Sequence, residues 1–455
     1  GMTELIEKKE DLIRYFESGS KPPGQWRVGS EYEKVAVSAR DGRALPFSGP
    51  AGVEKILKLL AERHGYEPED EHGRILALKT PRASITIEPG GQIELSGEQC
   101  ETIHCAYREF SEHSEQLIDA GREVGAVILG LGMQPISRIG EIELLPKARY
   151  HIMYPYMARK GSLGQRMMKQ TAGVQANLDY KDEADAMRKL RVSMGIVPLM
   201  YAIFANSALC DGDLNGYQSY RGHIWSDTDR ERCGMPEFVF REDSSFADYA
   251  DFALDVPMYF LIRGHEYIDL TKSPGLTFGR FMKDGWNGQR ARLEDWANHL
   301  TTIFTEVRLK NYIEVRTADS QPPAMMLALP ALLKGILYND DCLGAAWDLV
   351  KRWTYRERLE LVDQAQRVGL EGRAGRIRLG EIAHELLEIA AAGLGRAHAL
   401  NNRGEDESIY LRRTMEMVRE GVTPASLTIA RWKGQWNYDV PRMVRETSYE
   451  AERLG

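Results

Sequence analysis

The stretch RVGSEYEKVAV, residues 27–37, alternates polar and apolar side chains and says more about the fold than any other segment. Side chains of a β-strand alternate between two faces, so Glu31 and Glu33 share a face with Val35 and Val37. The valines predict that this face is buried. Carboxylates on a buried face are costly unless a cation or hydrogen-bond donors accompany them. Taken alone, such a strand is still typical of an ordinary half-solvated sheet.

Three further segments repeat this division into a polar and an apolar face. They are QIELS (92–96), VQANLDY (174–180) and NYIEVRT (311–317). Their polar faces carry Gln92 with Glu94, Gln175 with Asn177, and Glu314 with Arg316. In one sheet, the four polar faces would form a floor of carboxylates beside a single arginine. Crowded carboxylates repel one another unless cations intervene, so the recurrence predicts Mg²⁺ and nucleotide phosphate chemistry, with four ordinary amphipathic strands as the alternative.

Composition excludes several classes of protein. The chain has 455 residues, 43% of them hydrophobic, and a formal net charge of −8. The negative charge argues against nucleic acid or an anionic membrane as a partner. No apolar run approaches the ~20 residues of a membrane-spanning helix, and the charged first residues do not resemble a secretory signal. The five cysteines form no Cys-x-x-Cys pair, which predicts a reducing, cytoplasmic location.

Hydrophobic periodicity outlines the remaining organisation. It predicts helices over 3–17, 51–63, 101–124 and 183–209, irregular segments over 133–172 and 215–245, and helices almost throughout beyond 320. Between 83 and 96 it predicts two strands, interrupted at Pro89-Gly90-Gly91. The predicted fold class is therefore α+β, with a catalytic body over 1–320 and a helical section over 321–455 packed on it as one continuous unit.

Most familiar catalytic motifs are absent from the sequence. There is no GxxxxGK[ST] phosphate loop, no complete GxGxxG and no GxSxG elbow. The segment Cys100–Cys105 has no second pair of zinc ligands at a suitable spacing, and we interpret it as the opening of an amphipathic helix. Two cationic and aromatic segments, 147–153 and 219–225, carry Arg149 and Arg221. An arginine can bind a carboxylate through two hydrogen bonds, which suits an amino-acid substrate, although a surface ion pair is the commoner role.

Longer motifs resemble a known family. They are GSEYEK (29–34), ITIEPGGQIELSG (85–97), PKARYHIM (146–153), VQANLDY (174–180), RGHIWSDTDRER (221–232), ALDVPMYF (253–260), NHLTTIFTEVRLKNYIEVR (298–316) and GVTPA (421–425). These motifs are similar to those of the plant-type glutamate–cysteine ligases, which also occur in bacteria, and they span nearly the whole chain. The resemblance implies a glutamine-synthetase-like fold, a curved antiparallel sheet forming a half-barrel funnel surrounded by helices. It also implies ATP-dependent joining of the glutamate γ-carboxylate to the cysteine amine, the first step of glutathione synthesis.

The resemblance also implies roles for individual residues. The expected Mg²⁺ ligands, for two or three ions, are Glu31, Glu33, Glu94, Gln175 and Glu314, with Glu88 a further carboxylate for the cofactor site. Arg316 is expected to face the transferred phosphate and, with Glu31 and Glu314, to serve catalysis. Arg149, Arg221 and Tyr259, together with Asn177 on the sheet, are expected to bind substrate.

One departure from the plant pattern bears on regulation. Plant members carry cysteines that act as redox switches, whereas the corresponding positions here hold Tyr107, Leu270 and Leu327. We therefore expect no disulfide switch of the plant kind, and a monomer rather than a homodimer. The alternatives are a ligase of the same fold with another amine acceptor, and a catalytically silent relative that binds small molecules.

Overall fold

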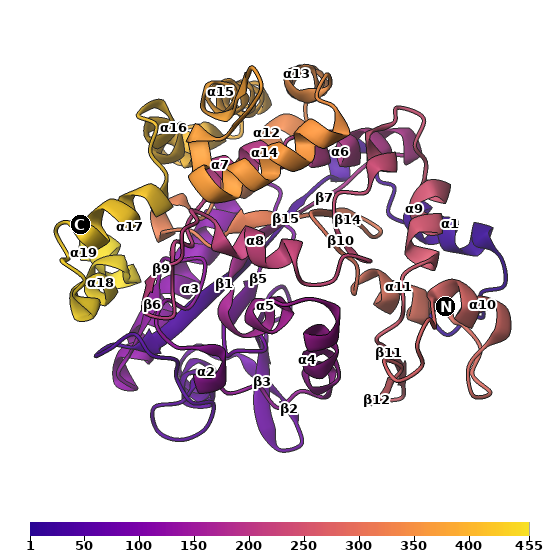
Figure 1. The fold of residues 1–455 in the computed structure, drawn as a ribbon, viewed down its shortest axis with the longest axis horizontal. Helices are drawn as coiled ribbons and strands as arrows, with labels where there is room; N and C mark the ends of the chain where they lie inside the picture. Colours follow the sequence, from indigo (N-terminus) through magenta and orange to yellow (C-terminus); the bar gives the residue numbers. More distant parts are fainter. Residues whose placement is uncertain (455) are drawn as a thin grey trace.

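An antiparallel sheet forms the centre of the molecule (Figure 1). The computed structural model describes residues 1–454, and within them nine strands run in the order β14-β15-β7-β1-β5-β4-β3-β2, with β6 paired to β1. The strands are β1 (Val28–Ser38), β2 (Glu67–Glu71), β3 (Arg74–Lys79), β4 (Ser84–Ile87), β5 (Ile93–Ser96), β6 (Ala126–Leu129), β7 (Gly173–Leu178), β14 (Val307–Leu309) and β15 (Ile313–Asp319). The sheet is open, because its path ends at β14 and at β2.

The prediction that the four polar-faced segments share one sheet is confirmed. They form the neighbouring strands β15, β7, β1 and β5. Glu31 lies opposite Gln175, and Glu33 lies opposite Glu94. Glu314 lies opposite Asn177. Residues directly opposite one another on adjacent strands point to the same side of the sheet, so this register gathers the polar faces on one surface.

Shorter strands make small pairs outside the main sheet. They are β8 (Leu209–Cys210) with β9 (Asp213–Leu214), β10 (Cys233–Gly234) with β13 (Phe304–Thr305), β11 (Phe260–Arg263) with β12 (Glu266–Asp269), and β16 (Arg373–Ala374) with β17 (Ile377–Arg378). The 3₁₀ helices are η1 (Pro23–Gln25), η2 (Ile139–Glu141), η3 (Glu237–Phe240), η4 (Pro323–Met325), η5 (Gly369–Glu371) and η6 (Glu407–Leu411).

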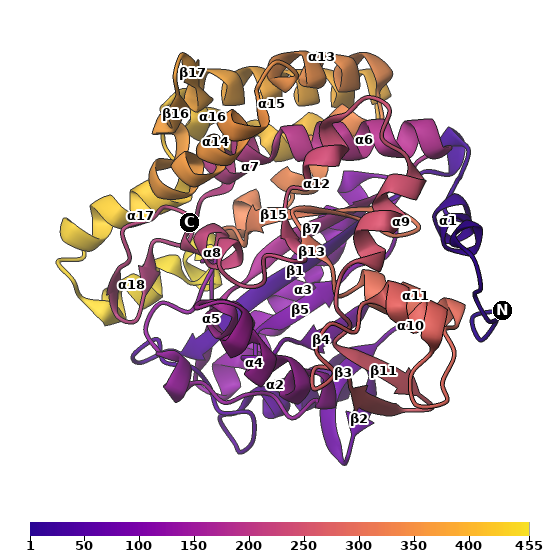
Figure 2. The same ribbon diagram turned by 45° about the vertical axis from the view of Figure 1, so that its right-hand side comes forward.

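Helices pack against both faces of the sheet (Figures 1 and 2). Those before residue 320 are α1 (Lys9–Glu17), α2 (Val53–His64), α3 (Ile103–Glu123), α4 (Ala148–Lys160), α5 (Gly164–Gln170), α6 (Glu183–Gly195), α7 (Val197–Phe204), α8 (Tyr220–Ser226), α9 (Phe246–Leu254), α10 (Phe278–Asp284) and α11 (Leu293–Leu300). The apolar face of the sheet packs on α2 and α3, where the ring of Tyr32 lies 4.9 Å from that of Phe110. The polar face is turned toward α4, α5 and α8.

The chain beyond β15 is helical apart from the hairpin β16–β17. Its helices are α12 (Ala328–Leu337), α13 (Asp340–Val350), α14 (Tyr355–Val368), α15 (Leu379–Ala397), α16 (Arg412–Arg419), α17 (Pro424–Lys433), α18 (Val440–Thr447) and α19 (Tyr449–Leu454). One hydrophobic core joins this section to the sheet, because α12 packs on β7 and on β1. The division into 1–320 and 321–455 stays a prediction, and residue 455 lies outside the described residues.

Four predicted segments differ from the structure, the fourth being the predicted helix over 183–209. Helix α1 begins only at Lys9, because residue Ile6 is buried and its N–H donates to the carbonyl of Ala291 in an extended pairing. The segment 133–172 is largely the helices α4 and α5, and Pro155 inside α4 resembles a helix breaker in the sequence. The segment 215–245 contains α8, a helix of seven residues that is too short to show periodicity.

The predicted helix over 183–209 is divided in two. Helix α6 ends at Gly195 and α7 begins at Val197, with Pro198 in its first turn. A proline is tolerated there because the first N–H groups of a helix have no partner within it. No helix among residues 1–454 is long and apolar enough to cross a membrane.

Candidate active site

A cavity of about 270 Å³ lies between the polar face of the sheet and helices α4, α5 and α8. Carboxylates and amides line the side formed by the sheet: Glu31, Glu33, Glu88, Gln92, Glu94 and Gln175. Arginines and aromatic rings line the remaining wall: Arg149, Tyr150, Arg221, Trp225, Phe304, Arg308 and Arg316. Negative and positive groups thus face one cavity from different elements.

Three carboxylates converge on one point of this cavity. One carboxylate oxygen from each of Glu33, Glu88 and Glu94 lies within 4.8 Å of the other two. Glu33 and Glu94 are cross-strand neighbours, and Glu88 precedes the Pro89-Gly90-Gly91 interruption between β4 and β5. The Gly173 N–H donates to Glu33 Oε1 at 2.7 Å, which orients this carboxylate.

The electrostatics of these three groups favour a bound cation. Burial, followed by the charge of Glu88, raises the pKa of Glu33 to about 8. Burial and Glu88 likewise raise the pKa of Glu94 well above its usual range. The ionised forms of Glu33 and Glu94 are therefore disfavoured unless positive charge is supplied. An all-oxygen donor set is the kind that Mg²⁺ prefers, so the residues present fit this ion.

A second polar cluster lies beside the first on the sheet. Asn177 Nδ2 donates to Glu31 Oε2 at 3.3 Å, and Asn177 Oδ1 is buried without a partner. Burial and the neighbouring Glu314 raise the pKa of Glu31 to about 7. Gln175 is the cross-strand neighbour of Glu31 and also lines the cavity. The Glu31 carboxylate faces the cavity, whereas the unpartnered amide oxygen of Asn177 is buried beside it.

Glu314 has a different environment, because it is paired with an arginine. Arg308 Nε donates to Glu314 Oε2 at 2.6 Å, and Lys310 Nζ lies 3.9 Å from Glu314 Oε1. Burial would raise the pKa of Glu314, but Arg308 and Lys310 outweigh it and hold the pKa well below the usual range. Arg308 is fixed in turn by the carbonyls of Thr301 and Ile303. Glu314 is ionised and is not among the residues lining the cavity.

Arg316 is a nearly buried cation in the cavity wall. Its guanidinium lies 5.1 Å from the ring centre of Trp225 and 5.3 Å from that of Phe304. Arg316 Nη1 donates to the carbonyl of Thr305 at 3.1 Å, whereas its Nε has no partner. Burial and then the charge of Arg308 lower its pKa to about 10, so the side chain remains protonated at neutral pH. A buried cation with a free N–H is suited to an anionic ligand.

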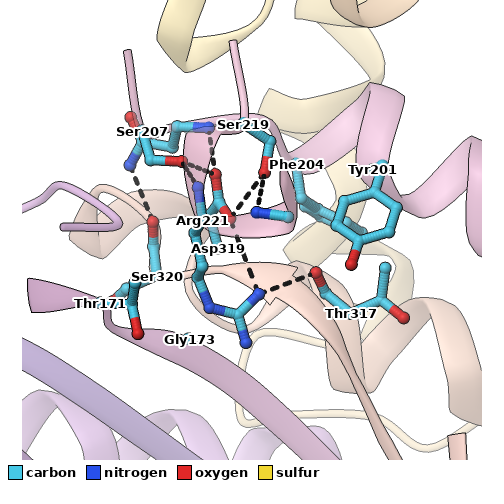
Figure 3. Close-up of polar contacts among 12 residues, drawn as sticks. Thr171, Gly173, Tyr201, Phe204, Ser207, Ser219, Arg221, Thr317, Asp319 and Ser320 are labelled. Carbon is cyan, nitrogen blue, oxygen red and sulfur yellow. Dashed lines mark hydrogen bonds and ion pairs between the residues drawn. The ribbon is translucent and has the colours of Figure 1, made fainter. Parts of the chain in front are cut away.

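Arg221 is held rigidly on the same wall (Figure 3). Its guanidinium donates to the carbonyls of Thr317 and Arg316 at 3.1 and 3.0 Å, and Nη1 lies 3.7 Å from Asp319 Oδ1. Asp319 is itself fixed by the Asn206 N–H and by the hydroxyls of Ser207 and Ser219. This network orients Arg221 before any ligand binds.

The two other residues that we predicted to bind substrate, Arg149 and Tyr259, lie at different depths from the cavity. Arg149, on α4, lines the cavity with its guanidinium 5.5 Å from the ring centre of Phe260. Tyr259 is buried behind Phe304, outside the cavity lining. Its hydroxyl donates to Asp229 Oδ2 at 3.3 Å, and Arg232 stacks on its ring at 3.8 Å. The role of Tyr259 in substrate binding stays a prediction.

Arg308 and Trp225 also line the cavity, although we did not predict them from the sequence. A signal for Arg308 was present, because the short hairpin 307–315 places it directly opposite Glu314. Trp225 lies four residues after Arg221, on the same face of α8. The structure thus brings together most of the predicted residues, with Asn177, Glu314 and Tyr259 adjacent to the cavity instead of lining it.

The fold and the cavity define a class of protein, one in which carboxylates and arginines face a single cavity on an antiparallel sheet. Residues 27–446 match the family model Glutamate-cysteine ligase family 2. The chain is 42% identical over 444 residues to the chloroplastic glutamate–cysteine ligase of Medicago truncatula, which covers 97% of this chain and 85% of that protein. Identity to the corresponding protein of Arabidopsis thaliana is 41%, covering 97% and 83%. The chain therefore belongs to the glutamate–cysteine ligase family.

Solved structures of distant sequence share the fold. The glutamate–cysteine ligase of Francisella tularensis, solved in complex with AMP, has a TM-score of 0.57 at 15% identity and covers 92% of this chain and 88% of its own. A bifunctional glutathione synthetase from Pasteurella multocida has a TM-score of 0.54 at 14% identity, covering 98% of this chain and 54% of its own. The predicted fold class, an α+β glutamine-synthetase-like arrangement, is confirmed.

Proposed function

We propose that this chain is an ATP-dependent glutamate–cysteine ligase, which joins the γ-carboxylate of L-glutamate to the amine of L-cysteine in the first step of glutathione synthesis. The observation that carries this proposal is the cavity itself. In a member of this family, it gathers carboxylates on the sheet opposite Arg149, Arg221 and Arg316. Carboxylates suit a metal–nucleotide complex, and arginines suit the carboxylates of an amino acid.

Mg²⁺ is the cofactor that the carboxylates fit best. The convergence of Glu33, Glu88 and Glu94 supports one ion, which these three residues would hold. Glu31 and Gln175 would hold a second, and Glu314 remains a candidate for a further position if its ion pair with Arg308 rearranges. Bound Mg²⁺ would neutralise the phosphates of ATP and make the γ-phosphate a better electrophile.

The arginines would divide the two anionic substrates between them. Arg316 has an unpartnered N–H and lies beside the carboxylate floor, so it would stabilise charge on the phosphoryl group during transfer. Arg308 sets the position of Glu314 and adds positive charge to the same wall. Arg149 and Arg221 would bind the carboxylates of glutamate, with Asn177 contributing through its contact with Glu31.

The chemistry then follows in two balanced steps. A γ-carboxylate oxygen of glutamate attacks the γ-phosphorus of ATP, and ADP leaves, which gives γ-glutamyl phosphate. The cysteine amine attacks the acyl carbon, loses a proton, and expels inorganic phosphate. The protein contributes mainly alignment and fixed charge, and no side chain forms a covalent intermediate.

ADP release tests this function directly. ATP, Mg²⁺ and L-glutamate are held constant, while the amine is L-cysteine, L-2-aminobutyrate, glycine, another amino acid, or none. We expect strong stimulation by cysteine, with γ-glutamylcysteine identified by its mass. Preference for another amine would retain the fold and overturn the acceptor. No ADP with any amine would indicate a silent relative that binds small molecules.

A further inference from the structure

A further polar cluster, separate from the two that belong to the cavity, lies on the opposite face of the sheet. Ser30 and Tyr32 flank Glu31 on β1, so their side chains point away from the cavity, toward α3. The loop between β5 and α3 runs beside them and carries Glu98 and Cys100, and Cys105 follows in the first turn of α3. None of these five residues lines the cavity.

The three loop and helix residues converge like metal ligands. One ligand atom from each of Glu98, Cys100 and Cys105 lies within 4.8 Å of the other two. Cys105 Sγ is 3.3 Å from Glu98 Oε1. Two ligand atoms at a tetrahedral zinc ion with bonds of about 2.3 and 2.0 Å are roughly 3.5 Å apart. The separation of Cys105 Sγ from Glu98 Oε1 is therefore close to that of a loaded site.

Two buried hydroxyls lie beside this cluster and make no hydrogen bond to a strong acceptor. The Tyr32 hydroxyl and Ser30 Oγ are buried neighbours of each other, and neither is bonded to any further residue. The other neighbours of the Tyr32 hydroxyl include Glu109, Cys100 and Cys105. A thiol is a weak acceptor, whereas a metal-bound thiolate is a strong one. Loading of the site would thus offer the Tyr32 hydroxyl a stronger acceptor than the thiols provide.

We propose that Glu98, Cys100 and Cys105 form a binding site for a thiophilic divalent cation of the zinc class, on the face of the sheet opposite the catalytic cavity. On binding, the two thiols release their protons to solvent and ligate as thiolates, and Glu98 ligates through one carboxylate oxygen. The two thiolates and one carboxylate exceed the charge of the divalent ion by one, and the Tyr32 hydroxyl donates to a thiolate. Glu98 has 28% of its side chain exposed, which provides a path for entry.

His104, which the sequence places within the same segment, is excluded as a ligand. Its Nδ1 lies 2.6 Å from the Tyr410 hydroxyl and its Nε2 lies 2.9 Å from the Ala399 carbonyl, so both ring nitrogens are occupied. Our interpretation of Cys100–Cys105 as a helix opening holds for the backbone, since α3 begins at Ile103. It overlooked Glu98, because a spacing rule for pairs of cysteines does not include a carboxylate from the preceding loop.

The site would link three elements of the fold. The N–H and carbonyl of Cys100 are both hydrogen-bonded to Val28 at the start of β1, and Cys105 belongs to α3. Glu109, further along α3, accepts the N–H of Glu98. An ion at this position would tie β1, the loop and α3 together, so we expect it to raise the unfolding temperature by binding the folded state alone.

Cobalt and zinc titrations of the reduced, chelator-treated full-length chain test this site. Excess Mg²⁺ is present throughout to occupy the carboxylates of the cavity. Cobalt bound by thiolates absorbs strongly in the near ultraviolet, a signature that carboxylates do not produce. We expect about one cobalt per chain with this band, displacement of the cobalt by zinc, and a rise in unfolding temperature with zinc.

Variants distinguish this site from other cysteines. Cys100→Ser and Cys105→Ser should each abolish the band, and Glu98→Gln should weaken binding by at least about tenfold. Cys342→Ser is the matched control, because Cys342 is buried in the first turn of α13 and its thiol is hydrogen-bonded to the Ile389 carbonyl and to Arg396, away from the proposed site. If a variant of a buried cysteine fails to fold, the comparison of metal binding between the wild-type chain and Glu98→Gln still tests the proposal.

Three results would overturn the proposal. One is the absence of the band in the wild-type chain. Another is a band that survives in Cys100→Ser or disappears in Cys342→Ser. The third is a Cys100–Cys105 disulfide, detected by peptide mass, in protein purified under air without any bound metal.

Discussion

Arg308 Nε donates a 2.6 Å hydrogen bond to Glu314 Oε2 across a two-stranded hairpin, and both side chains are buried. Breaking a buried ion pair from one side leaves a charge without its partner, which costs about 3–5 kcal/mol. We therefore expect Arg308→Met to lower the free energy of unfolding by about this amount, measured by chemical denaturation.

A variant that changes both Arg308 and Glu314 distinguishes the loss of their ion pair from the other effects of each substitution on stability. Arg308→Met combined with Glu314→Gln should lose clearly less stability than the two single variants added together, because the second change removes the unpaired carboxylate. Strict additivity would mean that the two residues are not coupled. Glu314→Gln alone should lower kcat by at least ~100-fold, as expected for loss of one preorganised charge.

The carboxylate cluster should be essential for turnover. Glu31→Gln, Glu33→Gln and Glu94→Gln remove one negative charge each from the proposed Mg²⁺ site and should each lower kcat by at least ~100-fold. The loss should be partly relieved by higher Mg²⁺ concentration, since the defect lies in metal binding. Glu62→Gln, an exposed position on α2, is the control and should leave kcat unchanged. Near-normal turnover in the first three variants would refute the assignment.

The same carboxylates predict how stability depends on pH when metal is removed. Folding raises the pKa of Glu31 to about 7 and of Glu33 to about 8, mainly through burial, so the folded state binds these protons more tightly than the unfolded state. Their contribution to stability is fully present below the unfolded pKa of about 4.5 and is lost as pH rises through 7 to 8.

Unfolding temperatures of the chelator-treated protein should therefore fall between pH 6 and pH 9. Added Mg²⁺ should flatten this dependence, because the ion replaces the protons as the source of positive charge. The Glu33→Gln variant should show a weaker dependence without metal. A metal-free protein that is equally stable at pH 6 and pH 9 would contradict the prediction.

Gly173 offers a way to displace Arg221 without removing its charge. A methyl group at Gly173 would lie 2.5 Å from Arg221 Nη2, too close to be accommodated without movement of the guanidinium. Gly173→Ala should therefore raise the KM for glutamate by about tenfold or more, while the KM for ATP changes little, as Arg221→Ala should also do. Gly140→Ala is the control, since its added methyl would meet no atom within 4 Å. If the KM for glutamate is unchanged in both Gly173→Ala and Arg221→Ala, Arg221 has only a structural role.

Variants of Tyr259 and Tyr150 test whether a tyrosine must line the cavity in order to affect substrate binding. Tyr150 lines the cavity, whereas the Tyr259 hydroxyl donates to Asp229 one layer behind it. Tyr259→Phe leaves Asp229 with one donor fewer and should cost about 1 kcal/mol of stability, with little change in the KM for glutamate. Tyr150→Phe should change substrate KM more than stability. A large rise in glutamate KM for Tyr259→Phe would restore Tyr259 to the substrate site.

The strands were more predictable than the helices that cover the cavity. Alternation over 27–37 and 311–317 identified β1 to within one residue and β15 to within two residues at each end, because a period of two is visible even in short segments. Helices α4 and α8 were interpreted as irregular segments. The internal Pro155 obscured α4, and seven residues give α8 less than two turns of pattern.

The sequence by itself determined which side chains share a face of each strand, since alternation is a local property of the backbone. It also determined family membership, and with it the prediction that Glu31, Glu33, Glu94 and Arg316 belong to the metal and phosphate site. Only the tertiary structure decided which faces meet, because strand order joins residues far apart in the chain. That order sets Glu31 opposite Gln175 and Glu33 opposite Glu94, and the packing of the helices places Tyr259 behind the wall. Burial then fixes the charge of each group, and burial is a property of the packed molecule rather than of any segment.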